Sequence, residues 1–179
     1  VSLLLVLCVT VGAIGEEKLP GDAGYGYSYR FVTRDTIEIT AYTGYERNVT
    51  VPAEIDGYTV VGIAYFGRDK AIGPNPVVEQ VTLPDTVRYI GAGAFAYWPN
   101  SDDTASMLQE IVLPAGLEVI GEDAFYNCFS LNTVEIPASV QEIGAYAFSN
   151  CKALQNFKLL GNQTVLRDMV WAAFWTPRD

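Results

Sequence analysis

The 179-residue chain contains no histidine and only three cysteines. Without histidine, the commonest general base and metal ligand at neutral pH is missing, and Ser-His-Asp or Cys-His catalysis is excluded. Three cysteines are too few for a disulfide-rich scaffold, and nothing completes a zinc site. We therefore expect no metal, no cofactor and no enzymatic activity. A glycoside hydrolase that uses paired carboxylates stays open as a remote alternative, because it needs only Asp and Glu.

Basic residues are scarce as well. Lys and Arg number 11 against 21 Asp and Glu, which gives a formal net charge of −10. Nucleic-acid binding relies on a basic stripe that neutralises phosphates, so we expect no nucleic-acid partner. A chain of this length can bury a sizeable core without a metal or disulfide staple.

Long apolar runs are limited to residues 1–15, VSLLLVLCVTVGAIG. This run fits the apolar region of a signal peptide and falls short of the roughly 20 residues that span a bilayer. It has neither an initiating Met nor a basic leader, so we expect an incomplete signal peptide, with a truncated membrane anchor as the alternative. The mature chain is then expected to be secreted or at the cell surface, without stable membrane insertion.

What the chain does contain is an internal repeat. Four segments follow the pattern apolar-x-apolar-Pro, and three of them continue into I-G-x-x-A-F or a close variant. Leu108, Leu131 and Leu154 mark the last copies, which are spaced by 23 residues. An earlier step is 30 residues long, which predicts a loop insertion at 98–104. The first pattern begins at Val49, Val81, Ile111 and Val134, and the second at Ile90, Ile120 and Ile143.

The clearest copy of the repeat indicates how one unit folds. Leu131, Val134 and Ile136 are interleaved with polar residues, which is typical of a short strand with one buried face, and Pro137 ends that strand. A unit of this size cannot bury its apolar face alone, whereas stacked units bury continuous ladders. We therefore predict an α/β repeat fold: a short right-handed solenoid with a parallel sheet on one side.

The unit L-x-x-[VI]-x-[LI]-P-x-x-[VL]-x-x-I-G-x-x-A-F-x-x-C resembles the leucine-rich repeat of the BspA-like (Treponema-type) class. Residues 131–154 match it almost position for position, 108–131 nearly as well, and the first copies are degraded. The resemblance implies a non-catalytic, secreted or surface-exposed protein of the kind that adheres to host or microbial surface molecules. We expect a binding module for protein or glycan partners. A purely structural or interaction repeat domain of a larger surface protein is the alternative.

Both ends of the repeat region have the composition of caps. In residues 16–47 we expect a linker and an N-terminal β-hairpin, because Tyr25 to Val32 and Thr36 to Tyr42 alternate with period two. The repeats then occupy residues 48–160. Residues 161–179 are expected to be a C-terminal cap or a truncated repeat. A short amphipathic helix is indicated there by Val165, Leu166, Met169, Val170, Trp171, Phe174 and Trp175.

The candidate partner-binding face consists of the residues that point outward from the predicted sheet. A surface of mixed polar side chains is the usual recognition face of a solenoid. An ordinary solvated face is the alternative. The residues of this face are Gln80, Thr82, Glu110, Val112, Thr133, Glu135, Asn156 and Lys158.

A second candidate is an aromatic patch near the N-terminal hairpin, where tyrosines are frequent. Such a patch would stack against sugars or a protein partner. Cross-strand packing within the cap is the alternative. The residues of this candidate patch are Tyr25, Tyr27, Tyr29, Tyr42, Tyr45 and Tyr58.

Two further groups bear on chemistry. Cys128 and Cys151 occupy equivalent positions one repeat apart and are expected to be unbonded thiols in the core, with a disulfide as the alternative. Glu110, Glu135 and Glu142 are the acids that come nearest to a hydrolase pair. An open sheet offers such a pair no pocket.

Overall fold

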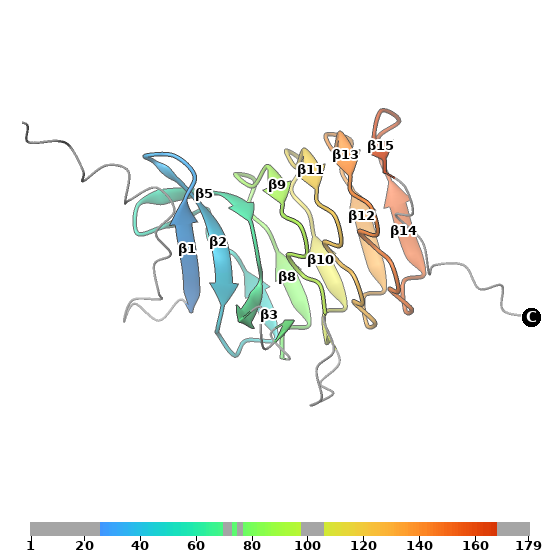
Figure 1. The fold of residues 1–179 in the computed structure, drawn as a ribbon, viewed down its shortest axis with the longest axis horizontal. Coiled ribbons are helices and arrows are strands. Elements are labelled where there is room, and N and C mark those ends of the chain that lie inside the picture. The colour runs from blue at the N-terminus through green and yellow to red at the C-terminus, as the bar shows by residue number, and fades with distance from the viewer. Residues whose placement is uncertain (1–25, 70–72, 75–76, 98–105, 168–179) are drawn as a thin grey trace, which may run out of the picture.

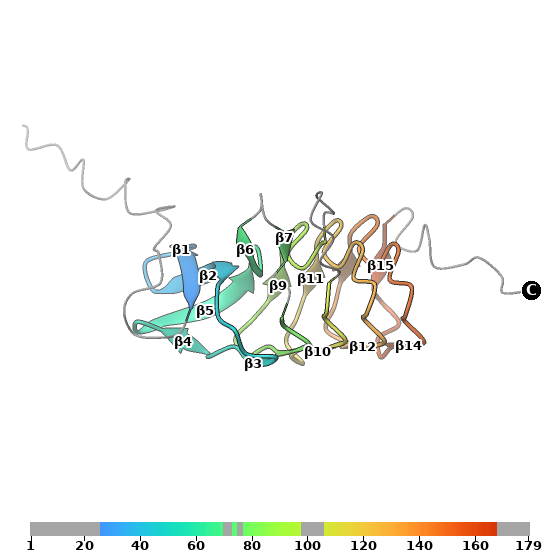
Figure 2. The same cartoon turned by 90° about the horizontal axis from the view of Figure 1, so that it is seen from below.

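The computed structural model describes residues 26–69, 73–74, 77–97 and 106–167. The predicted signal peptide, the predicted insertion at 98–104 and residues 168–179 of the predicted C-terminal cap lie outside these ranges. Regular structure in the described residues consists of fifteen strands, and the repeats stack into a solenoid (Figures 1 and 2).

One side of the solenoid is a five-stranded parallel sheet, as predicted from the repeat. It has the strand order β14-β12-β10-β8-β3, so neighbouring strands come from successive repeats. In the first four strands, buried residues alternate with more exposed ones, as the sequence pattern predicts; the last strand, residues 156–159, has no buried residue. The strands are β3 (Asn48–Thr50), β8 (Gln80–Thr82), β10 (Glu110–Val112), β12 (Thr133–Ile136) and β14 (Asn156–Leu159).

A second, larger sheet lies on another side of the solenoid (Figure 2). The sequence predicts only tight turns in this part of each repeat. The isoleucine of each I-G-x-x-A-F segment ends a two-residue strand of this sheet, and these short strands pair in parallel. The eight strands are β1 (Tyr27–Phe31), β2 (Thr36–Tyr42), β4 (Glu54–Ile55), β5 (Tyr58–Ile63), β9 (Tyr89–Ile90), β11 (Val119–Ile120), β13 (Glu142–Ile143) and β15 (Val165–Leu166). A separate antiparallel pair joins β6 (Gly67–Asp69) and β7 (Gly73–Pro74).

The predicted N-terminal hairpin is confirmed. β1 pairs antiparallel with β2, and β2 pairs in parallel with β5, so the hairpin extends the eight-stranded sheet beyond the first repeat. Its inward side chains join the same hydrophobic core as the repeats. The hairpin therefore closes the N-terminal end of the stack.

The core between the two sheets is built from equivalent residues of successive coils. Phe66, Phe95, Phe125 and Phe148 form one ladder, with ring centroids 5.2, 5.2 and 5.0 Å apart. At the corner of the last full coil, a Cβ on Gly144 would lie 2.4 Å from the backbone nitrogen of Glu122. A glycine at this corner lets adjacent coils approach closely enough for the ladders to form.

The predicted C-terminal helix is wrong at its start. Val165 and Leu166 form β15, which pairs in parallel with Glu142 and Ile143. Leu166 follows Ile143 by 23 residues, so the repeat period continues where a helical spacing was inferred. The stacking of one further repeat outweighs the local apolar pattern, because tertiary pairing commonly overrides propensity.

Candidate functional site

The outer face of the five-stranded sheet brings together the eight residues predicted for partner binding. The strands are in register, so a first row runs Asn48, Gln80, Glu110, Thr133 and Asn156. The residues between the outward positions are buried in the first four strands, where Val81 and Val134 are fully inaccessible, and Phe157 in the last strand is partly buried. A second outward row contains Thr50, Thr82, Val112, Glu135 and Lys158. We call these ten residues the sheet face.

Polar contacts link the sheet face from coil to coil. The amide of Gln80 donates a 3.2 Å hydrogen bond to Oε2 of Glu110. Lys158 Nζ lies 3.2 Å from Oε1 of Glu135 in an ion pair between the last two coils. Val112 is the apolar member of the two rows, and 42% of it is exposed. Exposed ion pairs contribute only about 0–1 kcal/mol to stability. Glu135 and Lys158 can therefore leave this contact at little cost and bind a partner instead.

The three candidate hydrolase acids do not share one face of the molecule. Glu110 and Glu135 lie on the sheet face, whereas Glu142 lies on β13 of the other sheet. A hydrogen bond from Arg167, whose Nε lies 2.8 Å from Glu142, lowers the pKa of that carboxyl below its ordinary value. In the described part of the chain, the one buried carboxylate belongs to Glu38, so no buried acid pair of the glycosidase type is found there.

The predicted aromatic patch is not a surface. Tyr27, Tyr29 and Tyr42 are 6, 2 and 1% exposed and belong to the core of the cap. Tyr27 and Tyr42 pack with ring centroids 4.9 Å apart, and Tyr58 packs against Phe31 at 4.8 Å. The alternative of packing within the cap is therefore correct for these residues. Of the other two, Tyr45 is 76% exposed and Tyr25 lies outside the described residues.

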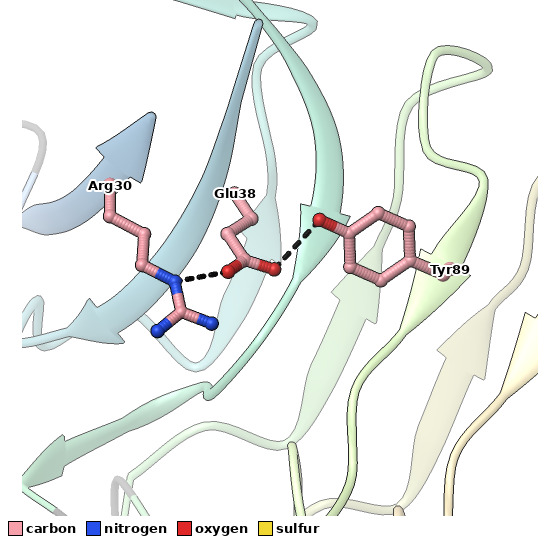
Figure 3. Close-up of polar contacts among 3 residues, drawn as sticks. All are labelled: Arg30, Glu38 and Tyr89. Carbon is pink, nitrogen blue, oxygen red and sulfur yellow. Dashed lines mark hydrogen bonds and ion pairs between the residues drawn. The ribbon is translucent and has the colours of Figure 1, made fainter. Parts of the chain in front are cut away.

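Sequence reasoning missed a polar cluster on the outer face of the eight-stranded sheet (Figure 3). Arg30, Glu38, Gly62 and Tyr89 occupy consecutive paired positions on β1, β2, β5 and β9. Glu38 forms an ion pair with Arg30 and accepts a 2.7 Å hydrogen bond from the hydroxyl of Tyr89. Burial, followed by the hydrogen bond to Glu38, raises the pKa of Tyr89 above its ordinary value.

Gly62 makes this cluster possible. A Cβ at that position would lie 2.2 Å from Cζ of Tyr89, so the tyrosine ring lies over the glycine. The register that aligns these residues passes through an irregularity between Ile37 and Glu38. No repeat pattern in the sequence signals that irregularity.

The two equivalent cysteines are free and buried, as expected. Each thiol donates to a carbonyl of the preceding coil: Cys128 to Phe95 at 3.2 Å and Cys151 to Phe125 at 3.1 Å. Burial raises the pKa of both thiols, that of Cys151 to about 12. They therefore act as part of the core and not as reactive groups.

Within the described ranges, no helix is long and apolar enough to span a membrane. Nor do three or more side chains of His, Cys, Asp or Glu gather there in a way that would hold a metal ion.

Comparison with known proteins identifies the repeat. The family described as "BspA type Leucine rich repeat region" matches residues 75–174 in six copies. No curated protein matches the chain.

Solved structures share the fold. A leucine-rich-repeat protein of Treponema pallidum is 34% identical, with a TM-score of 0.60, and the match covers 82% of this chain and 65% of that one. A leucine-rich-repeat protein of Bacteroides capillosus is 28% identical, with a TM-score of 0.61 over 80% of this chain and all of the other. The pneumococcal vaccine antigen PcpA, at 20% identity and a TM-score of 0.60, shares the fold over 86% of this chain and 40% of its own. This chain thus spans less than two thirds of the T. pallidum protein.

Proposed function

The chain belongs to the family of BspA-type leucine-rich-repeat proteins, and we propose that it is a secreted or cell-surface module that binds protein or glycan molecules on host or microbial surfaces through the sheet face. The observation that carries this proposal is the pair of in-register outward rows on the five-stranded sheet. Repeat solenoids use extended sheet surfaces of this kind for recognition, since each coil adds one set of side chains to a continuous platform.

Secretion is supported by the apolar run at residues 1–15, which has the length of a signal-peptide core. The formal net charge of −10 favours solubility and a neutral or basic partner. The sheet face itself supplies hydroxyl, amide and carboxylate groups, which hydrogen-bond to peptide groups and sugar hydroxyls alike.

A structural or interaction repeat domain of a larger surface protein is the second candidate. It is favoured by one observation, namely that the chain spans only 65% of the T. pallidum relative. The complete gene separates the two proposals: further domains around the repeats would favour the second.

The test is a binding screen of the purified protein against a panel of extracellular-matrix proteins and a glycan array. A face variant carries alanine at Gln80, Glu110, Thr133, Glu135 and Asn156. A matched control carries alanine at five exposed polar positions off the five-stranded sheet: Glu118, Glu122, Gln141, Asn162 and Gln163. We expect the face variant to lose at least about 10-fold in affinity, the equivalent of one good hot-spot contact. The control is expected to bind normally; binding that survives in the face variant would refute the face assignment.

A further inference from the structure

The centre of the sheet face carries an acid that forms no ion pair with any base among the described residues. Each of the three middle coils contributes one acid at or beside the rows: Glu79, Glu110 and Glu135. The coils at the two ends contribute one base each. Arg47 forms an ion pair with Glu79, and Lys158 forms one with Glu135. Among the ion pairs of the described residues, none involves Glu110, which accepts instead from the neutral amide of Gln80.

Glu110 also lies beside an exposed apolar side chain. Val112, two residues further along β10, projects from the same side of the strand and is 42% exposed. Its neighbour across the β8 pairing is Thr82, and the neighbours of Glu110 are Gln80 and Thr133. The middle strand therefore presents a carboxylate and an apolar surface side by side, with polar side chains on both neighbouring strands.

We propose, building on the proposed function, that the sheet face binds a protein partner through an arginine side chain of that partner, with the guanidinium on Glu110 and the methylene stem on Val112. Charge complementarity selects this occupant, because Glu110 is the acid of the face without a cation and the whole chain is acidic. The planar guanidinium matches a carboxylate in a bidentate contact. Its stem covers apolar surface while the charged head reaches the acid.

The position in the middle of the face strengthens this assignment. Residues that dominate binding energy cluster near the centre of an interface, and arginine is enriched among them. The paired charges at the two ends, Arg47 with Glu79 and Lys158 with Glu135, then form a polar rim around Glu110 and Val112. A neutral glycan would leave the Glu110 charge unbalanced.

The test uses two peptides of eight residues, one alternating arginine with serine and the other with citrulline in place of each arginine. Citrulline keeps the shape of the side chain and removes its charge. Titration of the protein with each peptide, followed by backbone amide NMR shifts, is expected to move Gln80, Glu110, Val112 and Thr133 with the arginine peptide only. Glu110→Gln is expected to weaken that binding about 10-fold, the loss of one charge-assisted contact. Glu118→Gln, an equally conservative change at an exposed acid off the sheet face, is expected to leave it unchanged.

The outcomes separate this inference from the function on which it rests. Equal shifts with the citrulline peptide, or shifts spread over exposed acids such as Glu118 and Glu122, would overturn the arginine assignment. A glycan recovered in the binding screen, whose affinity falls in the face variant but not in Glu110→Gln, would also overturn it and leave the binding face intact. Only a partner that binds the face variant normally would refute the proposed function itself.

Discussion

The hydroxyl of Tyr89 donates a 2.7 Å hydrogen bond to Oε2 of Glu38, a residue 51 positions earlier in the chain (Figure 3). Glu38 lies in the N-terminal hairpin and Tyr89 in the repeats, so the bond crosses the junction between cap and solenoid over the intervening strand β5. Glu38 is only 7% exposed, and Arg30 balances its charge from the other side. The contact therefore couples the stability of the cap to that of the repeats.

Tyr89→Phe tests this coupling, because it removes the hydroxyl and keeps the ring over Gly62. We expect the free energy of unfolding to fall by about 1–3 kcal/mol, since a buried carboxylate loses one donor. Urea unfolding provides the measurement. In a Glu38→Gln background the same change is expected to cost less, because the charge-assisted bond is already gone; strictly additive effects would mean that the two residues are not coupled.

Gly144 tests the close approach of the coils. An added Cβ would lie 2.4 Å from the backbone nitrogen of Glu122 and 2.6 Å from the carbonyl carbon of Gly121. Backbone atoms cannot move aside cheaply, so we expect Gly144→Ala to lower the free energy of unfolding by about 1–3 kcal/mol. In Gly116→Ala the nearest atom would be Nη1 of the Arg88 side chain, which can move, so this control is expected to remain close to wild type. Equal losses for both variants would argue against a packing effect.

The predictable part of the fold is the part whose pattern extends over several residues. In Leu131, Val134 and Ile136 the alternation and the following proline mark a strand, and the 23-residue period fixes its register. The sheet-face residues could be placed for the same reason. The short repeat strands of the eight-stranded sheet could not, because segments such as Val119–Ile120 and Glu142–Ile143 are only two residues long, too short to show the alternation that marks a strand.

The cap illustrates a different limit. Alternation in residues 25–32 and 36–42 identifies two strands, but it does not say what covers each face of the hairpin. The structure packs Tyr29 and Tyr42 inward with the repeats, so the tyrosines form core and not an exposed patch. The Glu38–Tyr89 contact depends on the irregularity after Ile37, which only the paired strands reveal.

Asn127 supports the turn that returns the chain after the phenylalanine ladder. Its side-chain amide donates a 3.0 Å hydrogen bond to the carbonyl of Tyr97, and Asn150 in the next coil donates to Oδ1 of Asn127. Its φ of 60° is in the left-handed region that asparagine tolerates better than most residues. We expect Asn127→Ala to lose about 2–4 kcal/mol in thermal or urea unfolding, from the unpaired carbonyl and the backbone strain together.

Asn127→Gly separates these two contributions, because glycine accepts a positive φ without strain. We expect it to be destabilised by about 1–3 kcal/mol, the hydrogen-bond part alone. If the glycine variant were as stable as the wild type, the side-chain contacts would have no energetic role and the effect of alanine would be backbone strain.

The two buried cysteines are expected to react slowly with thiol reagents in the folded protein. The raised pKa of Cys151, about 12, lowers its thiolate fraction near neutral pH by roughly a thousandfold relative to an ordinary cysteine. In a Cys8→Ser protein, which leaves Cys128 and Cys151, we expect negligible reaction with Ellman's reagent in the folded state. Two thiols per chain are expected after unfolding in urea. Rapid labelling of the folded protein would contradict the burial of these thiols, and a count near zero in urea would reveal a disulfide.

The raised pKa values of three tyrosines predict that the folded state loses stability at alkaline pH. Burial is the largest cause that raises the pKa values of Tyr27, Tyr42 and Tyr89 above the ordinary value; hydrogen bonds to Glu46 and Glu38 add to it for Tyr42 and Tyr89. Because the folded state holds these protons more tightly than the unfolded state, their contribution is complete below about pH 10 and is lost as the pH rises above it.

We therefore expect the free energy of unfolding to fall progressively as the pH rises above about 10, measured by urea unfolding at each pH. The absorbance of tyrosinate should show at least three tyrosines that ionise only when the protein unfolds. Tyr89→Phe is expected to make the pH dependence shallower, because one of the three groups no longer titrates. If all eleven tyrosines ionised at the ordinary pKa in the folded protein, burial and the Glu38 and Glu46 contacts would not hold these protons.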